Sequence, residues 1–337
     1  MTADFVLHVL LGLLPVCCFL AALVYLDSYK LVPQRWIAGT IVLGCAAGLA
    51  SYPLNSIGLQ WFDLGFTANT RYVAPIIEEA LKATVIWMLM RNNRIGFLVD
   101  AAIFGFAVGA GFAIFENLYY LAILPETKMG TWIVRGFGTA MMHGGATAMF
   151  AVIAHTMLER YPTKGRLTLL PGLLIATITH SVFNHFFLAP IVNTALVLGV
   201  LPLLFAIIFD RSDKALSDWL GSGFDADTEL LELINSGELP ASKVGMYLQS
   251  LREKFDGPIV ADLLCYLRLH TELSLRAKGL LMMRESGFMN RTGEETRAKL
   301  EELVYLEKSI GATGKLAIKP FLRMSQKDLR QFYVLSG

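Results

Sequence analysis

The chain has 337 residues, of which 55% are hydrophobic and 17% charged, and its mean hydropathy is +0.53. This composition is too apolar for an ordinary soluble domain and predicts an integral membrane protein. A net charge of +1 argues against a nucleic-acid partner. The four cysteines show neither metal-ligand nor disulfide spacing, and they are Cys17, Cys18, Cys45 and Cys265.

Apolar blocks follow one another from the N-terminus to about residue 209, and each is long enough to cross a bilayer as a helix. The first block, FVLHVLLGLLPVCCFLAALVYL, has no basic residue before it and exceeds a signal-peptide core, so we expect it to be a retained span. The fold class is therefore predicted to be an all-α polytopic membrane helix bundle of about seven spans. The predicted spans are 4–26, 36–58, 73–90, 96–124, 132–158, 167–189 and 191–209.

Basic residues alternate between the loops. The even-numbered loops carry only Arg71 and Lys128, whereas the odd-numbered loops and the segment after the last span carry Lys30, Arg35, Arg91, Arg94, Arg160, Lys164, Arg166, Arg211 and Lys214. Positively charged loops face the cytoplasm. The sequence therefore predicts an outside N-terminus and a cytoplasmic C-terminus.

The region after residue 210 has a different composition. Charges recur every few residues, and apolar residues return at spacings of three and four, which is typical of amphipathic helices. We therefore predict an integral membrane domain at 1–210 and a cytoplasmic helical domain at 211–337, joined by a linker at SDWLGSGFDAD (217–227). A small helical bundle with solvated charged faces explains these charges, and the sequence identifies no cytoplasmic regulator that would bind it.

The stretch APIIEEALKA (74–83) places Glu78, Glu79 and Lys82 inside the predicted third span. A charge at the centre of a transmembrane helix costs roughly 2.5–3.5 kcal/mol on insertion scales, so such groups usually face the bundle interior and have a function. Lys82 lies four residues after Glu78 and three after Glu79, so its amine can reach either carboxylate on the helix surface.

Other ionisable residues lie at a similar depth on the next three spans. With a rise of ~1.5 Å per residue, the depths below the outer edge are ~8–9 Å for Glu78 and Glu79, ~12 Å for Glu116, ~16 Å for His143, ~14 Å for His180 and ~8 Å for Asn184. Small residues close to them allow the helix backbones to approach, and these are Gly105, Gly109, Gly111, Gly144 and Gly145. Four consecutive spans are thus predicted to bring carboxylates and imidazoles into one layer in the outer half of the membrane.

Two kinds of hydrolytic chemistry fit these groups. In one, Glu116, His143 and His180 bind Zn²⁺, which makes a bound water more acidic. In the other, no metal is present: a glutamate deprotonates water, while histidine and asparagine stabilise the oxyanion. Both remain open at this stage. The candidate catalytic residues are Glu78, Glu79, Lys82, Glu116, His143, His180 and Asn184.

Less specific explanations exist for the single residues. Glu78 and Lys82 could form a structural ion pair, and Arg135 is expected to extend to the outer interface. An ion- or proton-coupled transporter could also use intramembrane Glu, His and Lys. A proton pathway should continue toward both faces, however, and the inner halves of these spans hold little beyond Asp100 and His155. The enzyme is therefore favoured over the transporter.

Four motifs, EEALK (78–82), FAIFE (112–116), MMHGG (141–145) and HSVFN (180–184), resemble in order and span placement those of the PrsW family of intramembrane proteases, which is related to the type II CAAX prenyl endopeptidases. The resemblance covers about residues 70–190. It implies a multi-pass endopeptidase of the bacterial plasma membrane that cleaves a single-pass, membrane-anchored substrate, an anti-sigma factor in known members, on the extracytoplasmic side.

The resemblance also implies roles for individual residues. Glu78, Glu79 and His180 are the first catalytic candidates, followed by Glu116, His143 and Asn184. In the CAAX relatives the second motif ends in histidine, whereas here it ends in Glu116, so their assignment of the water-activating residue does not carry over directly.

Overall fold

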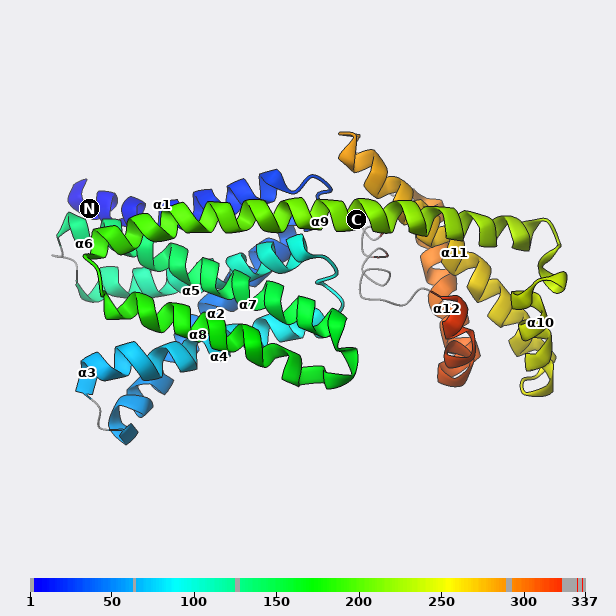
Figure 1. Ribbon diagram of the computed structural model, residues 1–337, viewed down its shortest axis with the longest axis horizontal. Helices are drawn as coiled ribbons and strands as arrows, with labels where there is room; N and C mark the ends of the chain where they lie inside the picture. The colour runs from blue at the N-terminus through cyan, green and yellow to red at the C-terminus, as the bar shows by residue number, and fades with distance from the viewer. Residues whose placement is uncertain are drawn as a thin grey trace. The chain divides into compact units, whose positions relative to one another are not determined.

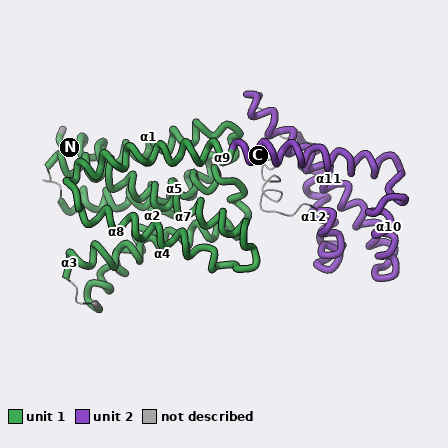
Figure 2. Tube along the Cα trace, in the orientation of Figure 1, with its two compact units in different colours: residues 1–212 green, residues 213–337 purple. Residues whose placement is uncertain are grey.

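The structure is a computed structural model that describes residues 3–62, 65–124, 128–288 and 293–322, together with Phe332 and Leu335. Every regular element within these residues is a helix (Figure 1). The chain divides into two compact units, residues 1–212 and 213–337 (Figure 2). This boundary lies two residues from the predicted one.

Unit 1 contains long helices with short π and 3₁₀ segments between some of them. The long helices are α1 (Ala3–Leu26), α2 (Gln34–Phe62), α4 (Ala74–Arg91), α5 (Leu98–Ile123), α7 (Ala140–Arg160), α8 (Leu170–His185) and the first part of α9 (Pro190–Asn235). The short elements are α3 (Gly65–Ala68), α6 (Met129–Ile133), the π-helices η1 (Asn69–Val73) and η2 (Val134–Thr139), and the 3₁₀ segment η3 (Pro162–Leu169).

Six helical stretches of the described chain are long and apolar enough to cross a membrane, at residues 4–26, 34–61, 98–123, 129–160, 162–185 and 190–235. The predicted third span corresponds to α4, which is too rich in charge to be among them: its 18 residues include Glu78, Glu79, Lys82 and Arg91. Contacts with α2, α5, α7 and α8 surround α4 instead. The bundle therefore holds its charged helix among apolar ones.

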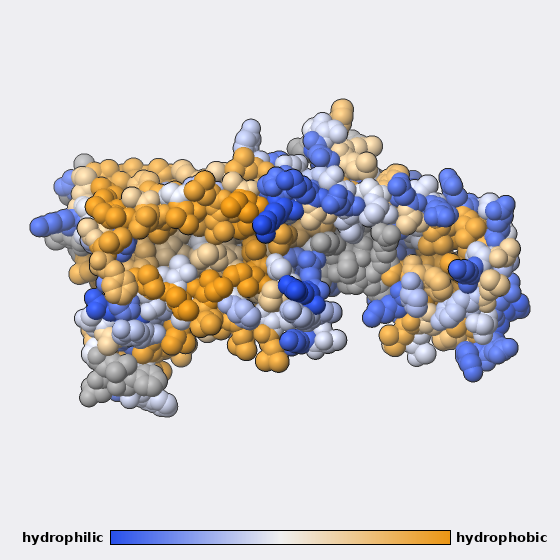
Figure 3. All heavy atoms as spheres, in the orientation of Figure 1, coloured by the Kyte–Doolittle hydropathy of each residue, from blue (hydrophilic) through white to orange (hydrophobic). Residues whose placement is uncertain are grey.

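The face of unit 1 that Figure 3 shows is largely apolar. Large side chains exposed on it include Leu14 of α1, Leu174 and Val182 of α8, and Leu203 of α9. In water such a surface would be unfavourable, whereas in a bilayer it contacts lipid.

The end of the sixth predicted span differs from the prediction. α8 ends at His185, and Phe186 adopts a left-handed conformation with φ of 47°. α9 then begins at Pro190, where the boundary between the last two spans was predicted.

Helices α5 and α7 form the centre of the bundle, and glycines bring their backbones into contact. A Cβ atom on Gly109 would lie 2.3 Å from the carbonyl oxygen of His143 and 2.7 Å from the Cα of Gly144. A Cβ on Gly105 would lie 2.7 Å from the Cα of Ala148. Backbone atoms cannot move aside as a side chain can, so only glycine fits at these positions.

Gly109→Ala should lower the melting temperature of the purified protein, because overpacking of this kind costs about 1–3 kcal/mol. Gly39→Ala on α2 is the matched control, since a Cβ there meets no atom within 4 Å. Equal melting temperatures for the two variants in the same detergent would contradict the close packing of α5 on α7.

The loop after α1 contains a buried carboxylate. Asp27 is 3% exposed, and its Oδ2 accepts a hydrogen bond of 2.7 Å from the backbone N–H of Leu31. Burial and the nearby charge of Asp100 raise the pKa of Asp27 to about 6, although the backbone N–H groups of Leu31 and Val32 and the charge of Lys30 act in the opposite direction.

This raised pKa predicts a pH dependence of stability. The folded protein binds a proton at Asp27 between about pH 4 and pH 6 that the unfolded chain does not, so stability should fall as pH rises through that window, by at most about 3 kcal/mol. Asp27→Asn should flatten this slope and stabilise the protein at pH 7.5, because an amide oxygen can still accept from Leu31. Melting temperatures at pH 4.5 and 7.5 check this, and an unchanged slope in Asp27→Asn would refute it.

Unit 2 is a helical bundle around an apolar core. It contains the rest of α9, α10 (Lys243–Ser250), α11 (Gly257–Glu285) and α12 (Glu294–Ile318), with 3₁₀ turns η4 (Leu239–Ala241), η5 (Leu251–Glu253) and η6 (Lys319–Phe321). Leu263, Leu267 and Leu273 of α11 are fully buried in this core.

The linker predicted at residues 217–227 is helical instead, because it lies inside α9. Two sets of contacts keep this segment helical despite its glycines. Leu216 and Leu220, four residues apart, are both buried, and Asp227 forms a 2.5 Å ion pair with the fully buried Lys278 of α11. Composition alone suggested a break, but packing along one face of the helix overrides it.

Candidate active site

Helix α4 contributes three charged groups to the interior of unit 1. Lys82 Nζ donates to Glu79 Oε1 at 2.6 Å and to His143 Nδ1 at 3.0 Å, and it lies 4.4 Å from the centre of the Phe112 ring. The Lys82 side chain is fully buried, and that of Glu79 is 1% exposed. A charge buried to this degree is tolerated only with such partners.

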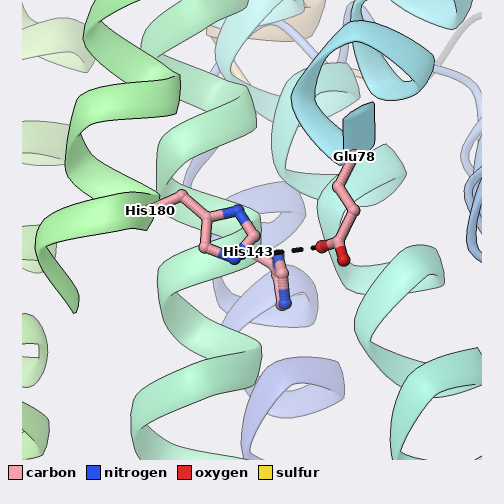
Figure 4. Close-up of side chains that lie close together, drawn as sticks. All are labelled: Glu78, His143 and His180. Atoms are coloured by element: carbon pink, nitrogen blue, oxygen red, sulfur yellow. Dashed lines mark ion pairs between the residues drawn. The ribbon is translucent and has the colours of Figure 1, made fainter. Parts of the chain in front are cut away.

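His180 of α8 lies between the two carboxylates of α4. Its Nδ1 is 2.9 Å from Glu79 Oε1, and its Nε2 is 3.8 Å from Glu78 Oε2 (Figure 4). A carboxylate can only accept, so Nδ1 carries the hydrogen and donates it to Glu79. In a neutral imidazole this leaves the lone pair of Nε2 on the side of Glu78.

His143 of α7 completes the cluster. Its ring is perpendicular to that of His180, with the two centres 4.7 Å apart. Nε2 lies 3.2 Å from Glu116 Oε2 of α5 and is therefore the donor, while Nδ1 accepts from Lys82. Each imidazole thus has one nitrogen oriented by a carboxylate.

Glu78, His143 and His180 form a group with the chemistry of a metal site. One ligand atom of each lies within 4.8 Å of those of the other two, and all three residues are buried. The donor set of one carboxylate and two imidazoles suits zinc, and the carboxylates behind the imidazoles are the outer partners that metal-bound histidines usually have. The residues therefore fit a metal. The predicted set had Glu116 in the place that the structure gives to Glu78.

Glu116 forms an ion pair with Arg135, a residue that was expected to extend to the interface. Arg135 Nη2 lies 3.3 Å from Glu116 Oε2, and its Nε donates to Asn117 Oδ1 at 2.9 Å. Its guanidinium also lies 3.9 Å from the centre of the Tyr120 ring. These contacts hold Glu116 beside His143.

Asn184 contacts the backbone of η1. It lies one turn after His180, but its Nδ2 donates to the backbone oxygen of Thr70 at 2.9 Å. Ser181 Oγ likewise donates to Arg71 O at 2.6 Å. A π-helix leaves backbone groups without their usual helical partners, and these two side chains satisfy carbonyls of η1. The geometry gives Asn184 a structural contact.

A residue that the sequence reasoning missed is Asn55 of α2, whose Nδ2 donates to Glu78 Oε1 at 3.0 Å. It lies three residues before the end of the predicted span 36–58, and therefore at the same predicted depth as the cluster. This depth is the one signal in the sequence that could have identified it.

His155 lies near the other end of α7, 3.8 Å from Glu159 and away from the cluster, as its sequence position indicated.

Buried carboxylates and imidazoles that converge between membrane helices have the chemistry that hydrolysis inside a membrane needs. A family model described as PrsW family intramembrane metalloprotease matches residues 32–209, just over half of the chain. The chain belongs to this family and is therefore a multi-pass membrane protease of the metallo type. Comparisons with curated proteins and with solved structures gave no match. The family match ends at Phe209, so it does not include unit 2.

Proposed function

We propose that this protease uses Glu78, His143 and His180 to bind zinc and hydrolyses a peptide bond in a single-pass membrane protein. The observation that carries the proposal is the convergence of three ligand atoms within 4.8 Å. A divalent ion bound there would supply a Lewis acid for the scissile carbonyl and make a water molecule more acidic.

The surrounding residues then have distinct tasks. Glu79 holds the Nδ1 hydrogen of His180, and Glu116 holds the Nε2 hydrogen of His143. Lys82 Nζ occupies the lone pair of His143 Nδ1 in this structure, so it has to turn away before that nitrogen can bind another group. Of the two adjacent glutamates, Glu79 accepts from both Lys82 and His180 at Oε1, whereas Glu78 contributes a ligand atom to the group.

Glu116 is the carboxylate of the cluster that the attacking water reaches most easily. Its side chain is 26% exposed, compared with 11% for Glu78 and 1% for Glu79. A general base has to reach both water and the reacting centre. Arg135 keeps this carboxylate in place beside His143.

The cluster lies at one end of its helices. Glu78 and His143 lie within the first five residues of α4 and α7, and His180 is near the end of α8, whereas the basic residues Arg91 and Arg160 end α4 and α7. Because positive residues favour the cytoplasmic side, we propose that cleavage occurs on the extracytoplasmic side of a bacterial plasma membrane, with the N-terminus outside and the C-terminus inside. An anti-sigma-factor-like regulator is the substrate class that the family suggests.

Cells that produce only the Glu79→Gln variant should accumulate an uncleaved single-pass membrane protein that cells with the unmodified protein process. The neutral amide accepts more weakly than a carboxylate and adds an N–H donor beside Lys82 and His180, so it no longer fixes the orientation of His180. Comparison of the two membrane proteomes identifies the substrate, and sequencing of the new terminus locates the cut. Identical proteomes would refute the proposal, and a cut on the cytoplasmic side would refute the proposed orientation.

A further inference from the structure

We propose that Asn55 is a positioning residue that holds one oxygen of Glu78 so that the other faces His180. This inference rests on the proposed function, since it concerns how Glu78 is presented as a ligand. Asn55 belongs to α2, a helix outside the four that carry the cluster, and it donates from Nδ2 to Glu78 Oε1 at 3.0 Å. Glu78 Oε2 is the oxygen 3.8 Å from His180 Nε2. The two carboxylate oxygens therefore have different partners.

The carboxylate determines the orientation of the amide. Reversing it would set Oδ1 of Asn55 against an oxygen of Glu78, and neither atom can donate. In the observed orientation Oδ1 is buried and has no hydrogen-bond partner among the described residues. A buried acceptor without a donor is unfavourable. An apolar side chain of similar size would avoid this cost, so packing of α2 alone does not account for an asparagine here.

The backbone around Asn55 fixes its position. Pro53 lies inside α2 two residues earlier, where it removes one helical hydrogen bond and favours a bend. One turn after Asn55, α2 approaches η1 and α4 through Gly58. A Cβ atom there would lie 3.1 Å from a methyl carbon of Val73 and 3.5 Å from one of Ile77. Residues three apart share a helix face, so the contact at Gly58 also directs Asn55 toward Glu78.

The hydrogen bond from Asn55 restricts the rotation of the Glu78 carboxylate. A carboxylate held at neither oxygen can present either one, or both, to a bound ion. With Oε1 fixed by Asn55, only Oε2 is presented, and the side chain is ordered before any ion arrives. Outer partners of this kind typically change metal affinity 10–100-fold when they are removed.

The test uses the purified full-length protein in detergent micelles, with Zn²⁺ and Co²⁺ as the probes. Zn²⁺ affinity is measured by competition with a chromophoric chelator, and the visible spectrum of bound Co²⁺ reports the ligand geometry. Asn55→Leu should bind Zn²⁺ 10–100-fold more weakly and change the Co²⁺ spectrum, while its melting temperature is no lower than that of the unmodified protein. Asn55→Gln, which keeps a donor, should recover much of the affinity.

Ser56→Ala is the matched control on the same helix, because the hydroxyl of Ser56 donates to Tyr52 O, away from the cluster. His180→Ala separates the two proposals. If His180→Ala loses Zn²⁺ binding and Asn55→Leu keeps full affinity and an unchanged Co²⁺ spectrum, the role of Asn55 is refuted and the metal site stands. If His180→Ala binds Zn²⁺ as tightly as the unmodified protein, both are refuted.

Discussion

Alanine at His180 should abolish proteolysis, whereas alanine at Asn184 should leave most of the activity per folded molecule. Both side chains belong to the same face of α8, yet His180 contacts Glu79 and Glu78 while Asn184 contacts the backbone of η1. Loss of a ligand to a catalytic ion removes several kcal/mol of transition-state stabilisation, which corresponds to a rate decrease on the order of 10³-fold. Loss of the Asn184 hydrogen bond costs about 1 kcal/mol of stability.

The measurement is cleavage of the identified substrate in membranes that contain equal amounts of each folded variant. Asn184→Ala should also show a lower melting temperature than the unmodified protein, since it no longer satisfies Thr70 O. If folded Asn184→Ala were as inactive as His180→Ala, Asn184 would act in catalysis as the family resemblance implied, and its contact with η1 would be secondary.

The depth of each site residue could be predicted from sequence because depth depends on two simple quantities, the ends of the apolar blocks and the helical rise. This calculation placed Glu78, Glu79, Glu116, His143 and His180 in one layer, and the structure brings their side chains within contact distance. The same reasoning separated His155 from the cluster. Errors of several residues at the span ends do not disturb the result, since each displaces the group by only a few ångströms.

The direction in which each side chain points could not be predicted in this way. It depends on rotation about the helix axis, and two π-helices, η1 and η2, immediately precede α4 and α7. Each π turn holds more residues than an α turn and rotates the helix that comes after it, and no sequence signal marked either one. Depth therefore placed Asn184 among the central residues, whereas its side chain contacts η1, and the contacts of the cluster include Asn55 and Arg135, which depth did not select.

Lys82→Met should destabilise the protein by about 3–5 kcal/mol, because it leaves the carboxylate of Glu79 buried without its cation. The two charged atoms are 2.6 Å apart, and neither side chain is more than 1% exposed. The imidazole of His180 still donates to Glu79, but one neutral donor does not replace an ammonium group. Unfolding in mixed micelles of mild and denaturing detergent measures the loss.

The double variant Lys82→Met/Glu79→Gln tests the pair itself. Without the Lys82–Glu79 ion pair it should recover most of the stability that Lys82→Met loses, since neutral groups of similar size often replace a buried ion pair with little cost. Additive losses in this double-mutant cycle would show that the two groups are not coupled. A double variant that is stable but cleaves no substrate would show that folding does not need the ion pair and that catalysis does. Glu79 then has to be charged to orient His180, and Lys82 is the cation that allows a charged carboxylate to remain at this depth.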